Sequence, residues 1–226
     1  MENVKISKAQ SNPLPAYTRV EENMNSVTHM IGVGFGLAAL ISCVIVAAIH
    51  ANVAGIIGAV IYGISMIALY AVSSVYHGLR AESIKKTFRV IDHCTVYFLI
   101  AGTYTPILIS AVATINPVKA YSLLGVEWGL AAVAVTLTAI DMKKFTVPSM
   151  ICYLLLGWSV VFIFPTAVEA ITVPGFTWLL AGGIVYTIGS VLYGIGKRVR
   201  YMHSVFHIFC LLGTALQYVC VIVYCL

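Results

Sequence analysis

Long apolar runs separated by short polar breaks make up most of the chain. A helix needs about 20 apolar residues to cross the hydrocarbon core of a bilayer. Runs of this length occupy residues 27–49, 53–76, 91–113, 120–140, 146–166, 175–196 and 202–225. The pattern predicts seven transmembrane helices joined by short loops, preceded by a polar tail at residues 1–26.

The composition agrees with this pattern. Hydrophobic residues make up 61% of the 226 residues and charged residues only 9%, whereas soluble domains carry about 25% charged residues. The sequence therefore predicts an all-α integral membrane protein, a seven-helix bundle. The tail has no apolar core followed by a cleavage site, so we expect the first apolar run to be retained. No basic stripe lies outside the short loops, which excludes nucleic-acid binding.

The positions of Lys and Arg predict the orientation of the bundle. All but one of the 13 basic residues lie in the tail or in the loops after the second, fourth and sixth helices. Lys119 alone falls on the other side. Because loops rich in Lys and Arg stay in the cytoplasm, we expect a cytoplasmic N-terminus and an external C-terminus.

The basic stretch at residues 79–90 has two interpretations. Leu79, Ile84 and Phe88 stand among basic residues there, as in a short interfacial helix that lies on anionic headgroups. The alternative is a basic loop that only sets the topology.

Ionisable residues inside the apolar runs gather at the predicted cytoplasmic end. His77 ends the second helix, Asp92 begins the third, and His203 and His207 lie in the first two turns of the seventh. Such groups are costly inside a membrane and usually functional. The first helix begins with further polar residues at the same depth: Glu22, Asn25 and His29.

Other ionisable residues have plainer interpretations. His93 points about 100° away from Asp92 on a helix, which favours a structural or interfacial role. For His29 we favour a headgroup contact over a place in a site. The external half contains few ionisable residues, each of which we place near a loop: His50, Glu127 and Glu169.

The histidines have the spacing of a metal site. His203 and His207 are four residues apart, so they lie on one helix face about one turn apart. With His77 they supply the three imidazoles that catalytic zinc sites use beside a water. Such a water loses a proton near neutral pH and becomes a nucleophile. The sequence predicts a zinc site, although the spacing does not fix the identity of the metal.

Two further residues are candidates for catalysis. Asp92 can orient a ligand or the water, or act as a general base. Ser73 stands four residues before His77 and shares its helix face. Its hydroxyl can hold the water or stabilise an oxyanion, or it can bond back to its own helix.

Six motifs follow one another along the chain: EENMNSVTH at 21–29, SSVYH at 73–77, IDH at 91–93, AGTYTP at 101–106, GGIVYTIG at 182–189 and HSVFH at 203–207. From about residue 21 to its end the chain thereby resembles the hemolysin III family, the bacterial branch of the progestin and adipoQ receptor superfamily.

The resemblance implies a seven-helix bundle in the plasma membrane with a cytoplasmic N-terminus. It also implies a zinc ion held by His77, His203 and His207, with Asp92 and Ser73 at the matching positions of the family. The superfamily is related to ceramidases, which implies hydrolysis of a lipid amide.

Three functions stay open at this point. The chain can be a zinc-dependent intramembrane hydrolase of a lipid amide or ester, a receptor-like regulator with a structural zinc, or a cytolytic protein as the family name suggests. A pore needs a polar stripe along several helices, whereas polar residues here gather at one end. We therefore favour the hydrolase, with a membrane lipid as substrate or ligand.

Overall fold

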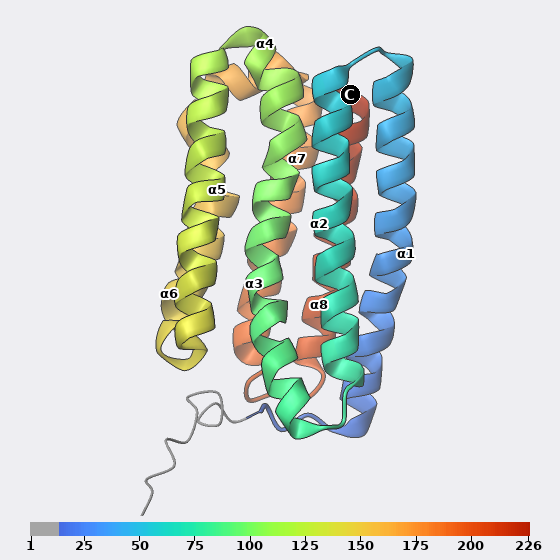
Figure 1. Ribbon diagram of the computed structural model, residues 1–226, viewed down its shortest axis with the longest axis vertical. Coiled ribbons are helices and arrows are strands. Elements are labelled where there is room, and N and C mark those ends of the chain that lie inside the picture. The colour runs from blue at the N-terminus through green and yellow to red at the C-terminus, as the bar shows by residue number, and fades with distance from the viewer. Residues whose placement is uncertain (1–13) are drawn as a thin grey trace, which may run out of the picture.

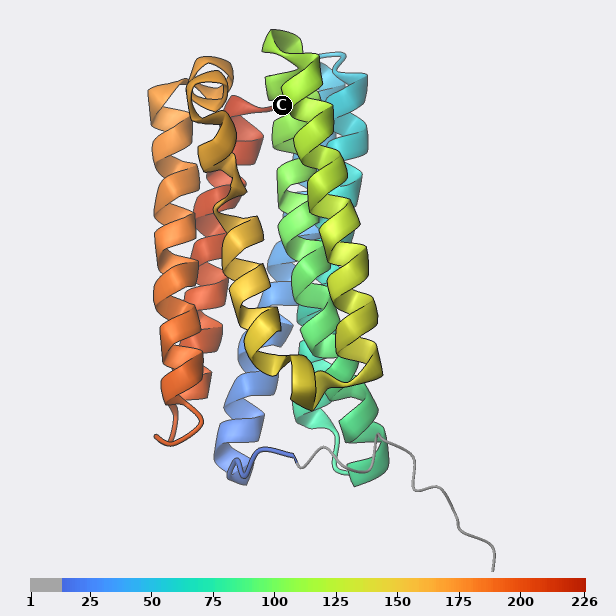
Figure 2. The same cartoon turned by 90° about the vertical axis from the view of Figure 1, so that its left-hand side faces the viewer.

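The computed structural model describes residues 14–226, which form a bundle of helices aligned along one axis (Figures 1 and 2). No strand occurs within this range. The long helices are α1 (Arg19–Ile49), α2 (Val53–Gly78), α3 (Glu82–Pro106), α5 (Pro117–Ile140), α6 (Met142–Gly157), α7 (Phe164–Ile195) and α8 (Met202–Tyr224). The short elements are the π-helix η2 (Ile107–Val112), α4 (Ala113–Ile115) and the 3₁₀-helix η3 (Ser159–Ile163).

Six segments among the described residues are long and apolar enough to cross a membrane. The prediction of an all-helical, multi-pass membrane protein is thus confirmed, whereas seven crossings and the orientation stay predictions. Seven crossings were predicted and six candidate spans are found, because Met142–Ile195 forms one apolar stretch of 54 residues. Thr172, with φ of 62°, interrupts the helical backbone inside it. Figure 2 shows the chain running in one direction along α6 and the start of α7, and back along the rest of α7.

Helix α1 begins at Arg19 and not at residue 27, because a capping box starts it within the polar segment. The backbone N–H of Glu21 donates to Thr18 Oγ1 at 3.3 Å, and the N–H of Thr18 donates to the Glu21 carboxylate at 2.9 Å. Residues 19–26, which were expected to belong to the polar tail, therefore form the first turns of α1. One face of α1 buries Glu21, Asn25 and His29 in succession.

The basic stretch at residues 79–90 is not a separate helix, since residues 79–81 connect α2 to α3 and residues 82–90 form the first turns of α3. Lys85 in this stretch is buried. Its Nζ donates to the carbonyl oxygens of His77 at 3.4 Å and Leu79 at 3.2 Å. The contact ties the first turn of α3 to the last turn of α2.

Small residues bring helices close together where the histidines lie. A Cβ atom at Gly32 would lie 2.5 Å from the Tyr70 ring, and one at Gly213 would lie 2.8 Å from the Tyr186 ring. Both tyrosine hydroxyls hydrogen-bond to the hydroxyl of Thr214. Close approach at small residues is the usual mode of helix packing in membranes, and here it joins α1, α2, α7 and α8.

The helix is broken between α6 and α7, and other helices satisfy the freed backbone groups. The Tyr104 hydroxyl donates to the Gly157 carbonyl at 2.9 Å and accepts from the Val160 N–H at 3.1 Å. The Ser159 hydroxyl donates to the Glu127 carboxylate at 2.5 Å. Glu127 is wholly buried within α5, so its placement near a loop is wrong. Irregular backbone persists at membrane depth only where protein buries it.

Candidate metal centre

Three histidines from two helices meet at the end of the bundle where α1 and α8 begin. His77 lies in the last turn of α2, and His203 and His207 lie in the first two turns of α8. All three are buried, and one ring nitrogen of each lies within 4.8 Å of the others. The Nε2 atoms of His203 and His207 are 3.1 Å apart. Two nitrogens bound to one tetrahedral zinc ion lie roughly 3.3 Å apart, given the usual bond lengths.

The unpaired nitrogens suit a cation. Among residues 14–226, no group hydrogen-bonds Nε2 of His77. The Nε2 atoms of His203 and His207 lie within hydrogen-bonding distance only of each other. Each neutral imidazole has a lone pair, and a buried lone pair without a partner costs about 1–3 kcal/mol. A metal ion between the rings would accept all three lone pairs. The three histidines thus fit a metal ion, and zinc as its identity stays a prediction.

Glu22 is the carboxylate that contacts the three-histidine cluster. Its Oε2 lies 2.6 Å from His77 Nδ1, and its Oε1 lies 2.7 Å from Lys85 Nζ. Because a carboxylate accepts, Nδ1 of His77 carries the hydrogen and Nε2 keeps the lone pair for a metal. Carboxylates commonly orient metal-binding histidines in this way. Such a role was predicted for Asp92, whereas Glu22 was predicted only to lie at the same depth.

The spacing of polar residues along the sequence could have identified Glu22 as part of the site. It stands three residues before Asn25 and seven before His29, which is the spacing of one helix face. The predicted helix begins only at residue 27, where the apolar run begins, and therefore excludes Glu22.

The same face of α1 also contacts the helix that holds the other two histidines. The Ser204 hydroxyl donates to Asn25 Oδ1 at 2.6 Å. The backbone N–H of Tyr201 donates to Glu21 Oε1 at 2.8 Å. Tyr201 precedes α8 in the left-handed conformation, with φ of 64°, so this bond fixes an otherwise unfavourable start of the helix. Helix α1 therefore positions both α2 and α8.

The two predicted catalytic residues face a shared cavity. Asp92 and Ser73 both line it, together with His203 and His207. The Asp92 carboxylate lies 3.8 Å from His93 Nδ1. Ser73 is buried on α2. Their roles in catalysis stay predictions.

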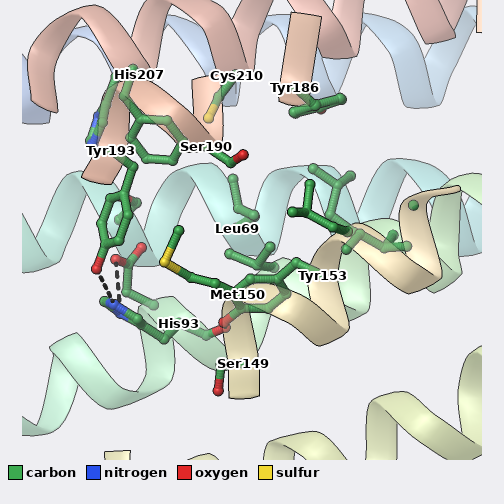
Figure 3. A pocket seen from close by; sticks show the side chains of 18 of the residues that line it. Leu69, His93, Ser149, Met150, Tyr153, Tyr186, Ser190, Tyr193, His207 and Cys210 are labelled. Carbon is green, nitrogen blue, oxygen red and sulfur yellow. Dashed lines mark hydrogen bonds and ion pairs between the residues drawn. The ribbon is translucent and has the colours of Figure 1, made fainter. Parts of the chain in front are cut away.

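The cavity measures about 210 Å³ and runs from the histidines into the bundle. Helices α2, α3, α6, α7 and α8 all contribute to its walls. Figure 3 shows Leu69, Met150 and Tyr153 along it, with Tyr193 and His93 pointing toward each other at one side. Its inner part is bordered mainly by apolar side chains: Leu69, Val96, Leu99, Ile100, Met150 and Leu154. A ligand that fits has an apolar chain and a polar group near the histidines.

His93 forms part of the cavity wall, which agrees with the structural role, one of the two predicted for it. Its Nδ1 donates to the Arg89 carbonyl at 2.9 Å, so Nε2 accepts the Tyr193 hydroxyl at 3.2 Å. The Tyr193 ring in turn packs against His203, with centroids 5.6 Å apart. His93 thus holds a tyrosine that packs against the three-histidine cluster.

Tyr17, just before α1, covers the cluster from the end of the bundle. Its ring stacks on His203 with centroids 4.8 Å apart and planes at 21°. Burial raises the pKa of the Tyr17 hydroxyl above its ordinary value, so this side chain is neutral at physiological pH. The N-terminal segment was expected to be only a polar tail, yet it supplies part of the site.

The chain matches known proteins over most of its length. The family model described as "Haemolysin-III related" matches residues 17–218. Hemolysin-3 of Bacillus cereus is 34% identical over 206 residues, which cover 91% of this chain and 92% of that protein. The Hemolysin-3 homolog of Bacillus subtilis (strain 168) is 34% identical over 212 residues, covering 92% and 96%. The human monocyte to macrophage differentiation factor is 26% identical over 165 residues, covering 70% and 66%.

Proposed function

The chain belongs to the haemolysin-III-related family of membrane proteins, and we propose that it is a zinc-dependent hydrolase of a lipid amide or ester. The observation that carries the proposal is the position of the three-histidine cluster beside an apolar cavity, because two of its members, His203 and His207, form part of the cavity wall. A metal site that opens into such a cavity is suited to a substrate with a long apolar chain. The bacterial relatives support a location in the plasma membrane.

His77, His203 and His207 would hold the metal ion. Bound by three imidazoles, zinc polarises a carbonyl group and lowers the pKa of a bound water to about 7. Three protein ligands are the usual number in catalytic zinc sites, whereas structural sites have four. The number of converging histidines therefore favours catalysis over a purely structural metal.

Glu22 and Lys85 would keep the metal ligands in position. Glu22 accepts the Nδ1 hydrogen of His77, and Lys85 holds the other carboxylate oxygen at 2.7 Å. The pairing leaves Glu22 few alternative orientations, since Lys85 is itself bound to the end of α2. Loss of such supporting contacts typically lowers metal affinity about 10–100-fold.

Asp92 and Ser73 would act on the substrate from the cavity wall. Asp92 takes the proton of the attacking water and returns it to the leaving group, as a general base and then a general acid. The Ser73 hydroxyl donates a hydrogen bond to the carbonyl oxygen of the substrate as negative charge develops there. The apolar inner part of the cavity binds the acyl chain and excludes water from it.

The test is a paired measurement of metal content and lipid cleavage. Protein purified in detergent is analysed by plasma mass spectrometry and incubated with a broad lipid extract. We expect about one zinc per chain, as three-histidine sites bind one ion, and release of fatty acid from an N-acyl or ester lipid. His203→Ala should lose zinc and cleavage together, while Asp92→Asn should keep zinc and lose cleavage. Zinc-loaded wild type that cleaves no lipid would refute the proposal.

A receptor-like regulator with a structural metal is the second candidate. A metal there would join α2 to α8, and the hydrogen bonds of α1 to both helices around the cluster favour such a structural role. In this case His203→Ala should lower the melting temperature strongly. Asp92→Asn should then leave the cellular effect of the protein unchanged, which the hydrolase does not allow.

A further inference from the structure

The cavity extends from the three-histidine cluster to a glutamine deep in the bundle. At the cluster it is lined by His203, His207 and His29. The His29 ring stacks on His207 with centroids 3.7 Å apart, so the expected headgroup contact is wrong, since His29 lies inside the bundle. The part of the cavity farthest from the cluster, its deep end, is lined by Gln217 of α8.

Gln217 lies on the inner side of α8, ten residues beyond His207. A helix turns by about 100° per residue, so Gln217 lies within about 40° of the face of His203. It lies about 180° away from Ile208, which is 50% exposed on the outer side of the bundle. The stem of Gln217 packs against α7, since a Cβ atom at Gly182 would lie 2.5 Å from Gln217 Cγ. A rise of 1.5 Å per residue places Gln217 roughly 15 Å from His207 along the helix.

The amide of Gln217 is unpaired, unlike its polar neighbours at the deep end. Tyr104, Trp158 and Thr187 line the same part of the cavity. The Tyr104 hydroxyl donates a hydrogen bond at 2.9 Å, the Trp158 indole N–H donates at 3.0 Å, and the Thr187 hydroxyl donates at 2.8 Å. Among residues 14–226, no group hydrogen-bonds the side-chain amide of Gln217. A molecule in the cavity can therefore supply its partner.

The chemistry of the amide restricts what that molecule carries. A saturated chain at the deep end would bury Nε2 and Oε1 of Gln217 without partners, which is costly. A hydroxyl on the chain can pair with either atom, because its oxygen accepts from Nε2 and its hydrogen donates to Oε1. An extended chain covers about 1.2 Å per bond, as a peptide backbone does with three bonds per residue. The spacing of roughly 15 Å along α8 therefore corresponds to about 12 bonds.

We propose that Gln217 binds a hydroxyl group about 12 carbons along an acyl chain whose carbonyl end lies at the three-histidine cluster. The inference rests on the proposed lipid substrate and deepens it, because it restricts the acyl chain to one that is hydroxylated near its middle. Gln217 is then a residue that determines specificity far from the reacting atoms. It touches neither the metal ligands nor the carbonyl group.

The test compares three fatty acids that differ only in their hydroxyl group: octadecanoate, 12-hydroxyoctadecanoate and 6-hydroxyoctadecanoate. Affinities for zinc-loaded protein in detergent are measured by displacement of tritiated octadecanoate. Gln217→Met keeps the length of the side chain and removes its donor and acceptor. Thr136→Val is the control, because Thr136 is exposed on α5 and its hydroxyl bonds only to the Ala132 carbonyl of its own helix, at 2.8 Å.

We expect wild type and Thr136→Val to bind 12-hydroxyoctadecanoate about fivefold more tightly than the other two acids, the effect of one buried hydrogen bond. Gln217→Met should lose this preference and bind octadecanoate at least as tightly as wild type, with unchanged zinc content. If Gln217→Met does not fold, Gln217→Leu removes the same polar atoms and is measured instead. Equal affinities in wild type, a preference that survives in Gln217→Met, or no binding of any of the acids would overturn the inference.

The outcomes separate this inference from the proposed function. A wild type that cleaves no lipid but prefers the 12-hydroxy acid through Gln217 refutes hydrolysis and leaves the hydroxyl site standing. A hydrolase whose preference among acyl chains does not depend on Gln217 refutes the hydroxyl site alone.

Discussion

The Glu22 carboxylate lies 2.6 Å from Nδ1 of His77, although the two residues are 55 positions apart. This contact fixes which nitrogen of His77 faces the other histidines. It also makes the start of α1 part of the metal centre, because the segment before the first apolar run supplies the carboxylate. The integrity of the site thus depends on a helix that contributes none of the three histidines.

Replacement of Glu22 by Gln should weaken metal binding by about 10–100-fold, because the charge that favours the Nδ1–H form of His77 is lost. The measurement is zinc affinity by competition with a chelator of known affinity. Glu82→Gln is the matched control, since Glu82 also pairs with a lysine but has a side chain that is 71% exposed. Equal affinities for the two variants would show that Glu22 does not support the site.

The parts of the site that are local in sequence could be predicted. His203 and His207 share a helix face because of their spacing, and His77 was added because it lies at the same depth in a neighbouring helix. Glu22 was predicted at the same depth but not as part of the helix, because the capping box at Thr18 extends α1 beyond its apolar run. His29 was assigned to the interface for the same reason.

The break between α6 and α7 also depends on contacts that the local sequence does not reveal. The apolar run predicted one continuous helix at residues 146–166, which is wrong, because η3 (Ser159–Ile163) interrupts it. The break itself is stabilised by Tyr104 from α3 and Glu127 from α5, and hydropathy along the chain contains no information on such partners. A buried carboxylate in a run of apolar residues was therefore placed near a loop.

Tyr17 should control access to the metal from the end of the bundle, because its ring stacks on His203. We expect Tyr17→Ala to release zinc to a water-soluble chelator several times faster than wild type. Tyr17→Phe keeps the ring and should release zinc at the wild-type rate. The measurement is the time course of zinc transfer to a chromogenic chelator, and equal rates in Tyr17→Ala and wild type would contradict this role.

Glu127 should stabilise the fold at the break between α6 and α7 without affecting the metal. Glu127→Ala leaves the buried Ser159 hydroxyl without its acceptor, which costs about 1–3 kcal/mol, and creates a cavity as well. Glu127→Gln keeps an acceptor and should cost less. Thermal unfolding in detergent measures both, with zinc content as the control. A Glu127→Ala protein as stable as wild type would show that another group replaces the carboxylate.

Gly183 offers a way to close the cavity and leave the metal centre intact. It lines the cavity, and a Cβ atom there would lie 4.0 Å from the nearest side chain, that of Trp158. Gly183→Phe should therefore fill the space meant for the acyl chain and abolish lipid binding, while the zinc content stays at the wild-type level. Gly34→Phe is the matched control, because a side chain at Gly34 meets nothing within 4 Å and Gly34 does not line the cavity. Tritiated N-acyl lipid binding and metal content are measured for both variants. Lipid binding that survives in Gly183→Phe with full zinc would place the acyl chain elsewhere on the protein.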